Sequence, residues 1–186
     1  MKNKFTVVRV FLWTTIISIG ASGTAFSHVT LAKKHAIAGS TLKNALQIGH
    51  GCTDDSGAVL STKRMIMDVP DGVRGVTAYA KPGWKINIIK GAVTPYELRG
   101  KIITEDTVKV MWTAMTDKFE VPDGIRDEFW FRASLPDKAA MSVYFPTIQV
   151  CGPTDKQRWV EIPNNSQEPS DLTKPAPRLV TTPSRL

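Results

Sequence analysis

Polar and apolar residues alternate in short runs over most of the chain. The alternation has a period of two, and the runs end at Pro, Asp and Gly, which is typical of strands joined by tight turns. It predicts strands over residues 58–60, 64–69, 73–80, 84–89, 107–112, 129–135, 141–151 (interrupted by Pro146) and 158–162. Residues 41–48 fit a helix or a strand, and we take them as a strand. The pattern as a whole predicts an all-β sandwich.

One turn sequence occurs twice, as Val-Pro-Asp-Gly-Val-Arg at residues 69–74 and Val-Pro-Asp-Gly-Ile-Arg at residues 121–126. Proline presets φ, aspartate bonds the neighbouring backbone and glycine supplies a positive φ. A duplicated half-domain would also give such a pair, but shared turn chemistry is the simpler interpretation.

The sequence after residue 162 has a different composition. Its prolines are Pro163, Pro169, Pro175, Pro177 and Pro183, and the residues between them are mostly polar. Such a composition disfavours a packed element. We therefore expect a sandwich domain over residues 28–162 and a flexible, disordered Pro-rich tail over residues 163–186.

Residues 1–27 have the three parts of a secretory signal peptide. These are a positive start at Lys2, Lys4 and Arg9, a mostly apolar run over residues 10–20, and the small residues of Ala25-Phe26-Ser27 that signal peptidase accepts. Cleavage after Ser27 would give a periplasmic or secreted protein. The alternative is an uncleaved N-terminal anchor, although the apolar run is short for a membrane span.

Charge and cysteines narrow the classes of function. The formal charge of +7 becomes +4 when the three charges of the signal peptide are removed. The remaining positive charges are scattered and form no basic stripe with aromatics, which argues against nucleic acid as a partner. In an oxidising compartment Cys52 and Cys151 are expected to form a disulfide. A metal-binding cysteine pair is the alternative, although C-x-x-C spacing is absent.

Cleavage after Ser27 would make His28 the first residue, and this changes its chemistry. The free α-amine and the imidazole Nδ1 can chelate one metal ion together. A carboxylate or a second imidazole would complete a square-planar N,O site, which suits Cu(II). A metal ion must displace the amine proton, so we expect binding to weaken in mild acid.

Several short segments occur in an order that resembles a known family. They include His28-Val29-Thr30-Leu31, Gly49-His50-Gly51-Cys52, Lys81-Pro82-Gly83-Trp84, Asp127-Glu128-Phe129, Leu135-Pro136-Asp137-Lys138, Tyr144-Phe145-Pro146 and Arg158-Trp159-Val160-Glu161. The set resembles the YcnI-like family of exported bacterial copper-binding proteins over residues 28–163. The resemblance implies an immunoglobulin-like or fibronectin-like β-sandwich and a Cu(II) site built on one N-terminal histidine.

The resemblance also implies a glutamate ligand, which matches Glu128, with Asp127 as the fallback. Family members can carry a tryptophan near the copper, but the segment aligned with it reads Tyr144-Phe145-Pro146 here. The candidate neighbours of the site are therefore Phe145, Trp112 and Trp130, between which the sequence does not choose. For Trp84, Trp112 and Trp159 the simpler expectation is core packing.

Two further histidines follow His28 in the mature chain. His50 would supply the second imidazole of a two-histidine brace, although a structural or exposed role is the simpler expectation. His35 lies in a basic run and is expected at the surface.

Together these observations predict a non-enzymatic Cu(II)-binding protein of copper homeostasis, storage or delivery. Its partners would be membrane copper transporters or periplasmic copper carriers. A metal-free interaction module on the same scaffold is the main alternative, because one fold can host many functions. An oxidative copper enzyme is a weaker alternative that would need a second histidine close to His28. A hydrolase is disfavoured, since no Gly-x-Ser-x-Gly motif is present.

Overall fold

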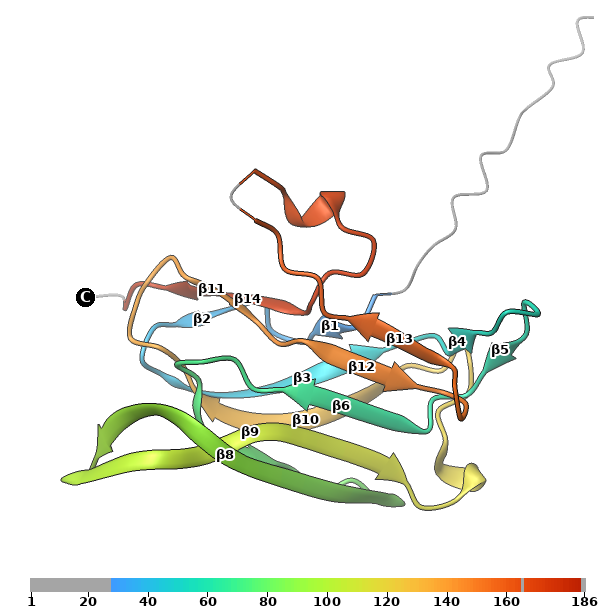
Figure 1. The fold of residues 1–186 in the computed structure, drawn as a ribbon, viewed down its shortest axis with the longest axis horizontal. Helices are drawn as coiled ribbons and strands as arrows, with labels where there is room; N and C mark the ends of the chain where they lie inside the picture. The colour runs from blue at the N-terminus through green and yellow to red at the C-terminus, as the bar shows by residue number, and fades with distance from the viewer. Residues whose placement is uncertain (1–27, 165, 185–186) are drawn as a thin grey trace, which may run out of the picture.

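A computed structural model describes residues 28–164 and 166–184, and these residues form a β-sandwich (Figure 1). The predicted signal peptide, residues 1–27, lies outside the described residues. Within the described ranges no helix has the length and apolar character needed to cross a membrane. The all-β prediction is confirmed.

Two sheets form the layers of the sandwich. The four-stranded sheet has the order β1 (Thr30–Leu31), β3 (Thr41–Ile48), β10 (Asp127–Ser134), β7 (Arg74–Ala78). The five-stranded sheet has the order β13 (Lys156–Trp159), β12 (Thr147–Val150), β6 (Arg64–Asp68), β9 (Lys101–Ala114), β8 (Trp84–Leu98). A three-stranded sheet of β11 (Ser142–Tyr144), β14 (Arg178–Thr182) and β2 (His35–Ile37) and the pair β4 (Cys52–Thr53), β5 (Val59–Leu60) complete the fold. Residues 41–48 are a strand, as predicted.

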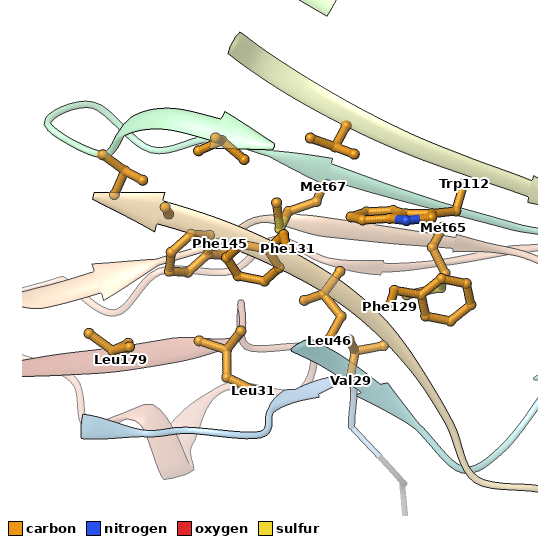
Figure 2. Packing of buried hydrophobic residues seen from close by; sticks show 14 of the residues in the cluster. Val29, Leu31, Leu46, Met65, Met67, Trp112, Phe129, Phe131, Phe145 and Leu179 are labelled. Carbon is orange, nitrogen blue, oxygen red and sulfur yellow. The ribbon is translucent and has the colours of Figure 1, made fainter. Parts of the chain in front are cut away.

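The core lies where the inner faces of these sheets meet. On β10, Phe129, Phe131 and Ala133 are fully buried, while Glu128 and Trp130, which alternate with them along the strand, face outward and are only partly buried. Aromatic rings join the layers, because Phe129 makes edge contacts with Trp84 of β8 and Trp112 of β9, at centroid distances of 5.0 and 5.8 Å. Figure 2 shows Phe129, Phe131 and Trp112 together with Met65, Met67, Phe145 and Leu179. Alternation along β10 therefore places a second row of side chains, which includes Glu128 and Trp130, on the outer face of the sheet.

The repeated Val-Pro-Asp-Gly sequence forms turns at both places. Gly72 has a φ of 80° and Gly124 a φ of 75°, the left-handed conformation that glycine adopts most easily. The turn interpretation is thus confirmed in each half of the chain.

The disulfide prediction is also confirmed, because Cys52 and Cys151 are bonded to each other. The bond joins β4 to the residue that directly follows β12, across a separation of 99 residues. It fixes the loop after β3 against the five-stranded sheet.

The prediction of a flexible tail from residue 163 is not confirmed. Residues 178–182 form β14, which pairs antiparallel with β11 and parallel with β2. Its Leu179 is fully buried and belongs to the main core cluster. The sandwich therefore extends beyond the expected boundary at residue 162, because tertiary pairing holds a strand that a proline-rich composition disfavours locally.

The hairpin of β8 and β9 is longer than the sequence pattern predicts. Its far half twists away from the sandwich (Figure 1), and the register shifts between Ile89 and Lys90 and again between Ala92 and Tyr96. Asp106 anchors this extension: its carboxylate accepts hydrogen bonds from the Gly75 N–H (2.7 Å) and the Tyr96 hydroxyl (2.8 Å).

Candidate functional site

One cavity of about 890 Å³ opens at the end of the four-stranded sheet. It lies where β1 begins, β3 ends and β10 begins, and the segment that follows β7 closes another side. Its lining includes His28, Thr30, Gln47, His50, Lys81, Arg126, Asp127, Glu128 and Trp130. The two predicted ligands, His28 and Glu128, thus face the same space.

Strand register explains why these side chains meet. Gln47 on the central strand β3 is paired with Thr30 of β1 on one side and with Glu128 of β10 on the other. The neighbours Val29 and Leu31 are buried in the core. His28 and Thr30 alternate with them and are only partly buried. Alternation therefore turns His28 toward the same outer face as Glu128.

A hydrogen bond fixes the carboxylate of Glu128. The side-chain amide of Gln47 donates from Nε2 to Oε1 of Glu128 at 2.7 Å. The bond takes up one lone pair of one oxygen, and the other oxygen is not part of it. A carboxylate held in this way has a defined orientation and can still accept a ligand.

Asp127, the fallback ligand, is already engaged. Its Oδ1 accepts a 2.6 Å hydrogen bond from the ammonium of Lys81 and a 2.7 Å bond from the backbone N–H of Glu128. The ammonium also lies 4.9 Å from the ring centroid of Phe129. Lys81 thus neutralises Asp127, and Glu128 is the better carboxylate for a bound cation.

The aromatic neighbour of His28 is Trp159. The two rings meet edge to face, with centroids 5.3 Å apart and an interplanar angle of 67°. Trp159 is almost fully buried, and its indole N–H donates to Oε1 of Gln149 at 3.3 Å. Core packing was expected for Trp159 and is found, but its contact with His28 was not foreseen.

Two of the three predicted neighbours of the site lie in the core, and the third lines the cavity. Trp112 packs against Phe129 in the core and Phe145 packs against Phe131 at 5.5 Å, and neither lines the cavity. Trp112 lies on β9 and Phe145 in the segment between β11 and β12, and both side chains are fully buried in the core. Trp130 does line the cavity, and the ammonium of Lys43 lies 4.8 Å from the centroid of its ring.

The remaining histidines occupy different places. His50 lines the same cavity as His28, and its Nδ1 lies 3.3 Å from Oδ1 of Asp123. His35 is on β2 and is exposed, as expected. Among residues 28–164 and 166–184, no three His, Cys, Asp or Glu side chains converge in a group that could hold a metal ion.

The fold and the site define a class of protein, an immunoglobulin-like β-sandwich with an open polar cavity beside its first strand. The chain belongs to the family described as a domain of unknown function, DUF1775, whose model matches residues 28–181. The chain is similar to a crystal structure of an uncharacterized protein from Nocardia farcinica, which is described as having an immunoglobulin-like fold. The similarity has a TM-score of 0.61 at 23% identity and covers 83% of this chain and 98% of the other. No curated protein matches the sequence.

Proposed function

We propose that this protein is an exported Cu(II)-binding protein of copper homeostasis or delivery. The ligands are the α-amine and imidazole Nδ1 of His28, freed by cleavage after Ser27, and the carboxylate of Glu128. One observation carries the proposal: His28 and Glu128 open into the same cavity, where Gln47 holds Glu128 at 2.7 Å. Copper is cargo in this proposal, so no catalytic step is assigned.

The donor chemistry fits Cu(II). Two nitrogens and a carboxylate oxygen are the donors that this ion prefers in a tetragonal site. The two nitrogens belong to one residue and chelate the ion, so their spacing is set by the covalent structure of His28 and not by the fold. The fold contributes the carboxylate and its orientation, since partners that hold a ligand commonly strengthen metal binding.

Three observations support export and the start of the mature chain at His28. The family model begins its match at residue 28, the predicted first residue after cleavage. The disulfide of Cys52 and Cys151 is typical of oxidising compartments. The signal-peptide pattern of residues 1–27 leads to the same boundary. Membrane copper transporters or periplasmic copper carriers are the partners that such a protein would serve.

The test compares two forms of the protein with different first residues. The mature form beginning at His28, confirmed by mass, is titrated with Cu(II) beside a form with one alanine ahead of His28. The extra residue converts the α-amine to a peptide nitrogen while the buried strands stay unchanged in sequence, so the affinity should fall sharply because the chelate loses one of its two nitrogens.

Glu128→Gln should lower the affinity as well, with Glu97→Gln on the exposed part of β8 as its matched control. Equal affinity of the mature and extended forms would overturn the proposal. A mature form that binds no copper would instead favour the metal-free interaction module.

A further inference from the structure

His50 presents a second imidazole to the cavity that contains His28 and Glu128. Its side chain is 53% exposed, so a small ion can reach it. We propose that Nε2 of His50 binds a second Cu(II) ion, more weakly than the His28 site. The choice of copper rests on the proposed function, whereas the role of His50 as a metal ligand rests on the contacts described next.

Asp123 prepares this imidazole for metal binding. The Nδ1 of His50 lies 3.3 Å from Oδ1 of Asp123, so Nε2 is the ring nitrogen that this contact leaves available to a metal ion. The same oxygen accepts a 3.0 Å hydrogen bond from the Gly51 N–H, which holds the carboxylate in place. Histidines that ligate metals commonly donate their other N–H to a carboxylate in this manner.

The backbone at His50 is also held from within the sandwich. Gln149 of β12 donates from Nε2 to the carbonyl oxygen of His50 at 2.7 Å and to Thr62 Oγ1 at 2.7 Å. Its Oε1 accepts from Trp159, the ring that contacts His28. The buried side-chain amide of Gln149 thus bonds both to the backbone of His50 and to Trp159, the ring that contacts His28. The disulfide at Cys52 lies two residues after His50.

The arrangement argues against a brace in which both imidazoles share one ion. Within the two described ranges, His28, His50 and the cavity carboxylates do not form a group of three that could hold a single ion. The cavity is roomy at about 890 Å³, and its acidic groups include Glu128 as well as the Lys81-neutralised Asp127. Arg126 adds a positive charge to the lining, which is one reason for the second ion to bind more weakly.

The test is a Cu(II) titration of the mature protein, followed by electron paramagnetic resonance and by loss of the imidazole signals in NMR. We expect two equivalents, the second of which broadens the His50 ring signals. His50→Asn should remove the second equivalent and leave the first. His35→Asn, at an exposed histidine outside the cavity, should leave both. Asp123→Asn should weaken the second equivalent by about tenfold or more, the usual effect of losing such a partner.

The outcomes separate this inference from the proposed function. The form with an alanine ahead of His28 should lose the first equivalent and keep the second. If that form keeps both, the proposed function fails and the role of His50 stands. If His50→Asn binds copper as His35→Asn does, the inference about His50 is wrong, whatever the first equivalent shows. Circular dichroism of each variant checks that the sandwich is intact.

Discussion

The side chains of Gln47 and Glu128 lie opposite each other on β3 and β10 and are joined by a 2.7 Å hydrogen bond. Gln47→Leu removes the donor and frees the carboxylate to rotate. The affinity for Cu(II) should fall about tenfold, since losing a group that holds a ligand commonly costs 10- to 100-fold. Isothermal titration with the mature protein measures the change. Gln157→Leu, on β13, is the control, and equal affinities in the two variants would contradict this role of Gln47.

Trp159 should report on copper at His28, because their rings are in contact at 5.3 Å. Cu(II) quenches nearby indoles, so binding the first equivalent should dim the protein's fluorescence. Trp159→Phe should remove most of the quenching and keep the packing against His28. Trp84→Phe, on β8, should remain quenched. A Trp159→Phe variant that is quenched as fully as the wild type would place the copper elsewhere, with Trp130 of the cavity lining as the next candidate.

Asp106 should give the domain a measurable acid sensitivity. Burial by itself would raise the pKa of Asp106, but the N–H groups of Gly75 and Thr107, the Tyr96 hydroxyl and the charge of Lys90 outweigh it and lower the pKa. Its stabilising contribution is therefore present above the pKa of an unfolded aspartate and is lost as the pH falls through the lower folded value.

Asp106→Asn should cost about 1.5–3 kcal/mol at neutral pH, the range for hydrogen bonds to charged groups. It should also flatten the fall of the unfolding free energy below about pH 4, near the ordinary aspartate value. Urea unfolding across this range measures both effects. Asp55→Asn, at an exposed loop position, is the control. An unchanged slope in Asp106→Asn would show that the anchor of the long hairpin does not titrate as described.

Leu179 tests whether the C-terminal strand is part of the core. Its side chain is fully buried, so Leu179→Ala should cost about 2–5 kcal/mol, the usual range for a leucine in a core. Leu98→Ala, at a residue that is 51% exposed on β8, should stay within about 0.5 kcal/mol of the wild type. Chemical unfolding compares the two. Equal stabilities would favour the flexible tail that the composition predicts.

Local patterns were enough to predict most of the strands. A period of two, ended by Pro-Asp-Gly turns, reports directly on one buried face and one exposed face. The C-terminal strand was missed because its prolines dominate the composition, although Leu179 and Thr181 alternate with outward residues over 178–182. Its partners, β2 and β11, lie far away in sequence, and only the folded chain shows the pairing.

The candidate ligands could be predicted from the sequence, but the residues that pack against them could not. His28 was predicted from its place after the cleavage site and Glu128 from the family resemblance, and both line one cavity. His28 and Trp159 lie far apart in sequence, so no local sequence pattern predicts the contact between their rings. The outward position of Gln47 between Thr30 and Glu128 likewise follows from strand register, which the sequence leaves open.

The three-stranded sheet joins the two ends of the domain, because β14 lies between β2 and β11. A chain that is still being synthesised lacks Leu179 until every strand from β1 to β13 has been made. Until then β2 has no neighbour on that side and the core beneath β11 is open to water. The core is therefore complete only when β14 is in place, and a copy truncated shortly before residue 178 would be a ready substrate for proteases.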